Sequence, residues 1–129
     1  MTKWHWLDER DALALHDRSL VLHGGGSGLR DQGLLQSALA RPQQRHAYGE
    51  AVDVITLAAT YTAGIVQNHP FIDGNKRTGF ILGVLFLELN GATFLASEEE
   101  AAAAVLALAA NDMDEPAYAA FLRGNVRLR

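Results

Sequence analysis

A short polar stretch between two strongly apolar segments most constrains how this chain can fold. The polar stretch, residues 69–79, reads HPFIDGNKRTG and holds a histidine, a carboxylate, an amide and two cations. The flanking segments, residues 51–67 and 80–89, read AVDVITLAATYTAGIVQ and FILGVLFLEL. Both are apolar on most faces, as buried helices are. We therefore expect the polar stretch to connect two central helices.

The length and composition predict one domain spanning residues 1–129. With 129 residues, 49% of them apolar, the chain can bury a sizeable core. A net charge of −4 provides no general basic surface, so direct nucleic-acid binding is not expected. The absence of cysteine suits a reducing cytoplasm. No signal peptide is apparent, and the longest apolar run is about half of the roughly 20 residues that a membrane span needs.

Apolar periodicity and helix-boundary signals predict an all-α bundle of about six helices with at most a minor β element. The first helix is expected from about Asp8 to the glycines at residues 24–26, and the segment from Gly24 to Arg30 is expected to be a mobile loop. The buried face of this helix is predicted to hold Ala12, Leu15, Ser19 and Leu22.

A proline is predicted to end the second helix. Asp31 is a suitable N-cap for a helix that runs to about Ala40. Pro42 pushes the residue before it out of the helical conformation. The polar segment from Pro42 to Gly49 is therefore predicted to be a loop beside the central stretch. The later elements are expected as helices at Ala51–Asn68, Asn75–Leu89, 97–110 and from Asp114 onward, with an extended link at 92–96.

The central stretch can bind phosphate at the start of the helix that follows it. A helix N-terminus has unpaired N–H groups and about half a positive charge, so it attracts anions. Gly74 has no Cβ and lets a ligand approach the backbone. Lys76 and Arg77 lie in the first turn, where the helix dipole disfavours cations unless an anion compensates. Asn75 can cap the helix or bind phosphate through its amide.

Asp73 and His69 add metal-binding and acid–base chemistry. Asp73 suits Mg²⁺, which proteins hold through one or two carboxylates together with phosphate oxygens. Histidine titrates near neutral pH, so His69 suits a general base that accepts a proton from an attacking hydroxyl. The combination predicts transfer of a group from a nucleotide to a hydroxyl.

Each of these residues also has an ordinary structural interpretation. A histidine at a helix end commonly forms a structural hydrogen bond, Asp-Gly is a common turn dipeptide, and Asn is a common N-cap. Lys76 and Arg77 could be solvated charges. A metal hydrolase built on His69 and Asp73 is a further alternative, but the remaining His–Asp pair, His16-Asp17, is expected on the polar side of the first helix. The combination within one stretch favours the phosphate site.

The stretch from His69 to Arg77 resembles the signature of the Fic/Doc family, whose Fic branch reads H-P-F-x-D/E-G-N-G-R-x-x-R. The matching residues are His69, Pro70, Phe71, Asp73, Gly74, Asn75 and Arg77. Lys76 replaces a glycine of the Fic branch, and Phe80 stands at its second arginine. Asn-Lys-Arg-Thr followed by an apolar residue is instead the form of the Doc, or death-on-curing, toxins. The resemblance spans roughly residues 10–95.

The resemblance implies a Fic/Doc helical fold and one of two reactions. Fic enzymes transfer AMP from ATP to a target hydroxyl, and their second arginine helps to hold the phosphates. Doc toxins are kinases that transfer the γ-phosphate to a threonine of elongation factor Tu, which halts translation. Because Phe80 cannot bind phosphate, the Doc-type kinase is favoured. A Fic-type nucleotidyltransferase and a non-catalytic binding module remain the alternatives.

The resemblance also implies roles for residues and partners. By position, His69 would be the base and Asp73 the Mg²⁺ ligand, while the phosphates of ATP would be held by Gly74, Asn75, Lys76 and Arg77. A cognate antitoxin would fold a disordered tail onto an apolar groove, which we expect near the first helix and the Gly24–Arg30 loop. The Pro42–Gly49 segment falls where the family has a flap that docks the target.

Overall fold

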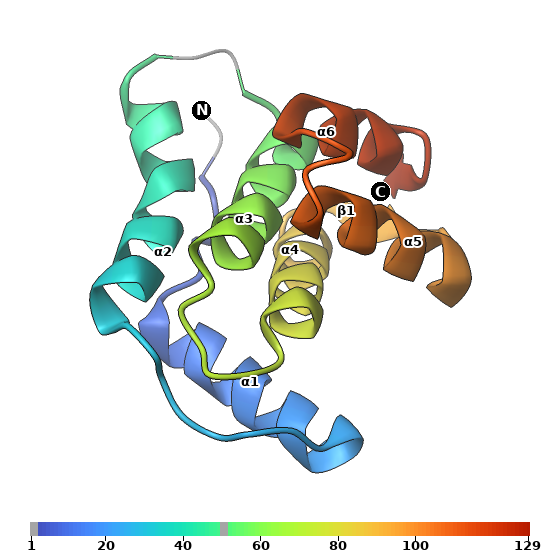
Figure 1. The fold of residues 1–129 in the computed structure, drawn as a ribbon. Helices are drawn as coiled ribbons and strands as arrows, with labels where there is room; N and C mark the ends of the chain where they lie inside the picture. Colours follow the sequence, from blue (N-terminus) through green and yellow to red (C-terminus); the bar gives the residue numbers. More distant parts are fainter. Residues whose placement is uncertain (1–2, 50–51) are drawn as a thin grey trace.

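Two adjacent helices, α3 and α4, form the centre of the structure, and the polar stretch connects them (Figure 1). The computed structural model describes residues 3–49 and 52–129. The elements are α1 (Glu9–His23), α2 (Gln32–Ala47), α3 (Val54–Asn68), α4 (Asn75–Leu89), β1 (Ala92–Phe94), α5 (Glu98–Ala109), α6 (Glu115–Arg123) and β2 (Val126–Leu128). The two strands pair antiparallel. The predicted all-α bundle with a minor β element is confirmed.

Small residues bring α3 and α4 into close contact. From Val54 to Val66 every residue except Thr56 is buried, so α3 is the core helix that its composition predicts. A Cβ at Gly79 of α4 would lie 3.1 Å from the carbonyl oxygen of Thr62. The Thr62 hydroxyl donates a hydrogen bond to the Gly79 carbonyl oxygen at 2.8 Å. This close crossing fixes the two ends between which the polar stretch runs.

The prediction that Pro42 ends the second helix is wrong, because α2 continues to Ala47 and contains this proline. Proline has no N–H, so the helix lacks the hydrogen bond that residue 42 would donate to Ala38, at a typical cost of about 3 kcal/mol. Pro42 itself is buried. Contacts made by the helix beyond the proline must therefore stabilise it, and the predicted Pro42–Gly49 loop is reduced to a turn at its end.

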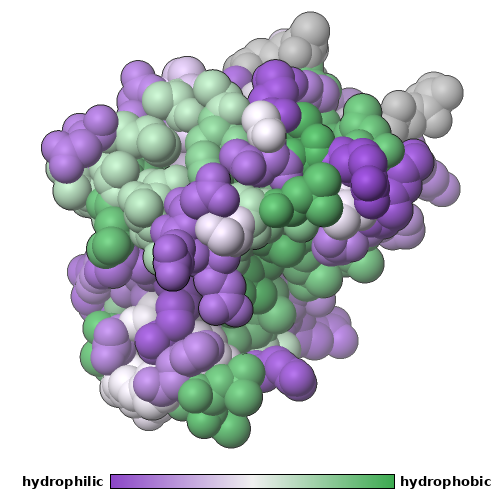
Figure 2. All heavy atoms as spheres, turned by 90° about the vertical axis from the view of Figure 1, so that its right-hand side faces the viewer, coloured by the Kyte–Doolittle hydropathy of each residue, from purple (hydrophilic) through white to green (hydrophobic). Residues whose placement is uncertain are grey.

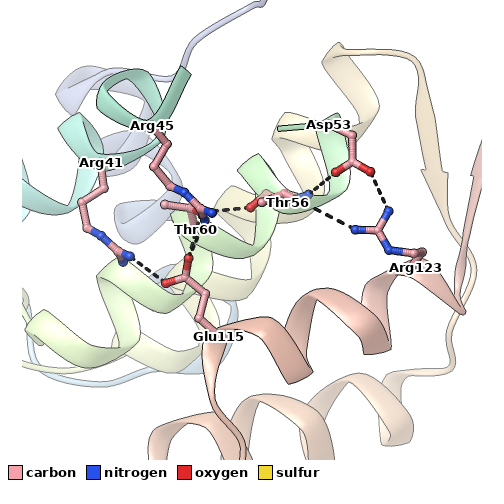
Figure 3. Close-up of polar contacts among 7 residues, drawn as sticks. All are labelled: Arg41, Arg45, Asp53, Thr56, Thr60, Glu115 and Arg123. Atoms are coloured by element: carbon pink, nitrogen blue, oxygen red, sulfur yellow. Dashed lines mark hydrogen bonds and ion pairs between the residues drawn. The ribbon is translucent and has the colours of Figure 1, made fainter. Parts of the chain in front are cut away.

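Those contacts centre on Glu115 at the start of α6 (Figure 3). Its carboxylate accepts hydrogen bonds from Arg41 at 2.8 Å and from Arg45 at 3.0 Å, and its side chain is only 17% exposed. Arg45 also donates to the hydroxyl of Thr60 on α3 at 2.8 Å. Ion pairs that are partly shielded from water and share several hydrogen bonds are stronger than exposed pairs. They tie the end of α2 to α3 and α6, so the helix continues past Pro42.

The first helix differs from its prediction at two positions. Leu22, expected in the core, is 65% exposed because the last turn of α1 extends past the body of the molecule (Figure 1). His16, expected on the polar side, is only 2% exposed. The buried residues of α1 are Ala12, His16 and Ser19. The buried face of α1 therefore includes two of the four predicted residues, Ala12 and Ser19, and also His16.

Asp53 sets the start of α3, since its side chain accepts a hydrogen bond from the N–H of Thr56 at 2.8 Å. The start expected near Ala51 lies outside the described residues. Asp53 also forms an ion pair with Arg123 of α6 (Figure 3). Partial burial acts to raise the pKa of Asp53, but hydrogen bonds from Arg123 and Thr56 outweigh it and lower the pKa to about 2. The pair therefore persists at neutral pH.

Among the described helices, none combines the length and apolar character that crossing a bilayer requires.

Candidate active site

The polar stretch forms a tight connection between α3 and α4, with a left-handed residue at each end. His69 is the C-cap of α3, with φ 53° and ψ 53°, and its side chain is exposed. Gly74 is the N-cap of α4, with φ 76°. Asn75, which could have been the cap, is instead the first residue of the helix. The left-handed conformation is ordinary for Gly74 but costs His69 roughly 1–2 kcal/mol, so other contacts must hold His69 there.

The loop after α1 lies along the polar stretch and forms hydrogen bonds with it. The N–H groups of Arg30 and Asp31 donate to the carbonyl oxygen of Pro70 at 2.7 and 3.0 Å. The N–H of Ile72 donates to the carbonyl oxygen of Gly28 at 3.1 Å. This pairing gives the segment, expected only to be a mobile loop, a defined position against the candidate site.

Asn75 and Phe71 hold the middle of the stretch. The Asn75 amide accepts a hydrogen bond from the Phe71 N–H and donates one to the Phe71 carbonyl oxygen, both at 2.9 Å. Both residues are buried. Because the side-chain amide is engaged in this way, the backbone N–H of Asn75 would have to be the group that binds an anion. Its predicted role in phosphate binding stays a prediction.

His16 is a residue of the site that the sequence interpretation missed. Its ring stacks on the ring of Phe71 with centroids 3.9 Å apart, and its Nε2 lies 2.8 Å from the carbonyl oxygen of Asp73. Its spacing of four residues from Ala12 and three from Ser19 is the helical period and could have indicated burial. His16 therefore packs against the polar stretch from α1 and supports its conformation. It does not form the second His–Asp metal pair that a hydrolase would need.

Asp73 presents an ionised carboxylate at the surface of the site. It accepts hydrogen bonds from the N–H of Gly26 at 3.2 Å and of Gly74 at 2.8 Å, and these bonds lower the pKa of its carboxyl group. Gly25 must be glycine here, since its φ is +118° and a Cβ would lie 2.8 Å from Oδ2 of Asp73. An exposed, charged carboxylate is a donor that Mg²⁺ prefers when phosphate oxygens and water complete its coordination. Asp73 therefore fits the predicted Mg²⁺.

The N-terminus of α4 differs from those of the other described helices. Each of the others has a side-chain cap, provided by Asp8, Asp31, Asp53, Ser97 and Asp114, whereas Gly74 gives α4 none. The first-turn N–H groups therefore have no side-chain acceptor among the described residues and could donate to an anion. Lys76 is exposed, and the Arg77 guanidinium is anchored by hydrogen bonds to the Ser19 hydroxyl at 3.3 Å and the Gly24 carbonyl at 3.1 Å. A phosphate at this helix end would meet two cations.

An apolar groove of about 710 Å³ adjoins the two cations. His23 of α1 lies at the groove together with Lys76 and Arg77, and the apolar lining includes Phe80, Ile81, Val84, Phe94, Val105 and Leu106. Phe80 packs edge-on against Phe94 with centroids 5.6 Å apart. Figure 2, which faces the α5 side of the molecule, shows hydrophobic atoms in a hollow bordered by hydrophilic side chains. The groove is thus continuous with the candidate phosphate site.

The predicted target-docking role of Pro42–Gly49 does not fit its position. Most of this segment is helix and belongs to α2. It lies at the opposite end of the molecule from the stretch that joins α3 to α4 (Figure 1). The loop that does lie along the stretch is residues 24–31, whose glycines were the sequence signal for it.

Comparison with known proteins identifies the family to which this chain belongs. The sequence model of the Fic/DOC family matches residues 6–87, which include α1, the loop after it and the whole polar stretch. The protein named "Protein kinase doc" of Escherichia phage P1 is 36% identical over 93 residues, covering 72% of this chain and 74% of that protein. "Toxin Doc" of Mycolicibacterium smegmatis is 34% identical over 125 residues, covering 92% of each chain. The chain therefore belongs to the Fic/DOC family, and these relatives place it in the Doc branch.

Proposed function

We propose that this protein is a cytoplasmic toxin and an ATP-dependent protein kinase that phosphorylates a threonine or serine of a translation factor, elongation factor Tu, and so arrests translation. The observation that carries the proposal is the N-terminus of α4, which has no side-chain cap and carries Lys76 and Arg77 in its first turn. Asp73 and His69 lie on the same connection. The names of the two relatives, a protein kinase and a toxin, support the same assignment.

In the proposed reaction the protein positions the reactants and stabilises charge. His69 accepts the proton of the target hydroxyl as its oxygen bonds to the γ-phosphorus. The bond between that phosphorus and the oxygen bridging it to the β-phosphate breaks, and ADP leaves with that oxygen. The first-turn N–H groups, Lys76 and Arg77 stabilise the charge on the phosphates. Bound Mg²⁺, held by Asp73, would neutralise part of the same charge.

Phe80 favours phosphate transfer over AMP transfer. Phe80 lies about one helical turn after Arg77 on α4 and lines the apolar groove. It occupies the sequence position at which a Fic-branch enzyme would have its second arginine. An aromatic ring offers no hydrogen bonds to phosphate, so the nucleotide would be held by Lys76 and Arg77 alone among the cations of this helix. The Fic-type nucleotidyltransferase therefore remains the second candidate.

Labelled ATP distinguishes the two reactions. We expect purified protein, ATP and elongation factor Tu to give labelled factor from γ-labelled ATP and none from α-labelled ATP. Mass spectrometry of the product should show addition of a phosphate rather than of AMP, on a threonine or serine. Label retained from the α-phosphate would refute the kinase proposal and support AMP transfer.

A toxin of this kind needs an antitoxin, and we propose that the groove between α4 and α5 receives it. An amphipathic helix of a partner could place apolar side chains on the groove and acidic side chains beside His23, Lys76 and Arg77. The occupant would then also cover the phosphate site. This location includes the end of α1, as expected from the sequence, but lies mainly on α4 and α5 rather than on the Gly24–Arg30 loop.

Leu106→Glu is expected to weaken antitoxin binding about 10-fold or more, because it places a carboxylate on the apolar lining of the groove. Leu106 is already 56% exposed, so the substitution should leave folding unchanged. The measurement is calorimetric titration with the protein encoded by the neighbouring reading frame. Leu128→Glu, at a 66% exposed leucine on β2, is the matched control. Equal affinities for the two variants would place the antitoxin elsewhere.

A further inference from the structure

We propose that Arg30, which lies outside the polar stretch, is a positioning residue that holds His69 in its active orientation. The proposal rests on the role of His69 as the base. Arg30 follows the glycine-rich loop after α1, 39 residues before His69. Its backbone and side chain both reach the end of α3, and together they contact three consecutive carbonyl groups.

The contacts of Arg30 surround His69 on both sides along the chain. Nε donates to the carbonyl oxygen of His69 at 2.7 Å, and Nη2 donates to that of Asn68 at 2.9 Å. The backbone N–H of Arg30 donates to the carbonyl oxygen of Pro70 at 2.7 Å. The last carbonyls of a helix have no partner within it, and a cation is favourable at this negative end of the helix dipole. Arg30 supplies both the donors and the charge.

The backbone of His69 makes this contact important for orientation. His69 and Asn111 are the two residues other than glycine with positive φ in the described chain, and His69 has φ 53°. Residues other than glycine rarely adopt this conformation and leave it readily when nothing holds them there. A change of φ or ψ would redirect the Cα–Cβ bond and with it the imidazole. By holding the carbonyl groups on both sides of His69, Arg30 fixes the direction in which its side chain points.

The planar guanidinium is essential to this arrangement. Its Nε and Nη2 donors are fixed relative to each other and match two adjacent carbonyl oxygens, whereas a lysine ammonium is a single flexible point charge. Arg30 is exposed, so its removal opens no cavity in the core. The loss should therefore affect the geometry of His69 more than the stability of the fold.

The test compares Arg30→Ala and Arg30→Lys with Arg127→Ala, which removes the same charge from an exposed site on β2. We expect both Arg30 variants to lower kcat for transfer from γ-labelled ATP to elongation factor Tu by about 10- to 100-fold, as small displacements of a catalytic group do. KM for ATP should change less than about 3-fold, since the phosphate-binding groups stay in place. Methylguanidine should restore part of the kcat of Arg30→Ala, and Arg127→Ala should match the unchanged protein.

NMR can test the effect of Arg30 on the His69 backbone without a substrate. The scalar coupling constant between the amide and Hα protons of His69 and the chemical shift of its Cα both report its backbone conformation. We expect both values to change in Arg30→Ala. Unchanged NMR parameters and kcat would overturn the proposal, as would a loss of kcat that only follows the unfolded fraction measured by circular dichroism. Full activity of His69→Ala would instead refute the proposed function, because it would show that His69 is not the base.

Discussion

Replacing His69 by asparagine is expected to abolish growth arrest and to lower the rate of phosphate transfer by about 10²- to 10⁴-fold, the contribution typical of a general base. The fold should be preserved for two reasons. The side chain of His69 is exposed, so its removal leaves no cavity. Asparagine also tolerates the left-handed conformation that this position requires, unlike most residues. The measurements are initial rates with γ-labelled ATP and plating efficiency after induction in cells.

His5→Asn is the matched control, since it changes an exposed histidine whose interactions with Asn90 use only its backbone. It should retain transfer and growth arrest. Thermal unfolding should give the same midpoint for both variants within about 2 °C. If His69→Asn still arrests growth, the protein acts through binding rather than catalysis, and the non-catalytic module becomes the better interpretation.

The central pair of helices and the site between them could be predicted because their signals are local. The apolar composition of α3 identifies it as a core helix, and the glycine at residue 74 marks the reversal before α4. The first-turn position of Lys76 and Arg77 follows from that boundary alone. The structure places all six predicted site residues on one connection and the first turn of α4, although their roles remain predictions.

The features that were missed depend on contacts distant in sequence. Pro42 lies inside α2 because Glu115, 73 residues later, holds the helix beyond it. His16 is buried because Phe71 and Asp73 lie against it, and no property of α1 alone places them there. Strand β2 forms because β1 offers it a partner, with Phe94 opposite Val126. Short-range propensity carries no information about such partners, so these contacts required the structure.

Gly83→Ala is expected to destabilise the protein by about 2–3 kcal/mol, although alanine is the better helix former by about 1 kcal/mol. A Cβ at residue 83 would clash with Oγ1 of Thr62 and lie 3.0 Å from the carbonyl oxygen of Ala58. Thr62 cannot simply rotate away, because its hydroxyl donates to the Gly79 carbonyl. The helices must separate, at a typical overpacking cost of 1–3 kcal/mol, or lose that buried hydrogen bond, at about 1 kcal/mol or more. For a chain of this size the melting temperature should fall by roughly 10 °C.

A double-mutant cycle with Thr62→Ala tests whether the clash is the cause. Removing Oγ1 should make Gly83→Ala less costly by about 1 kcal/mol or more, because only the contact with the Ala58 carbonyl remains. Gly124→Ala is the control. The φ of Gly124 is −76°, and the atoms nearest to an added Cβ lie at 3.7 and 3.8 Å. The free energy of unfolding of this variant should therefore change by less than about 0.5 kcal/mol. Strict additivity in the cycle would show that Thr62 does not oppose the new methyl group.

The polar stretch connects these same two helices. Phosphate transfer by Gly83→Ala should therefore also fall at temperatures where the variant is still folded.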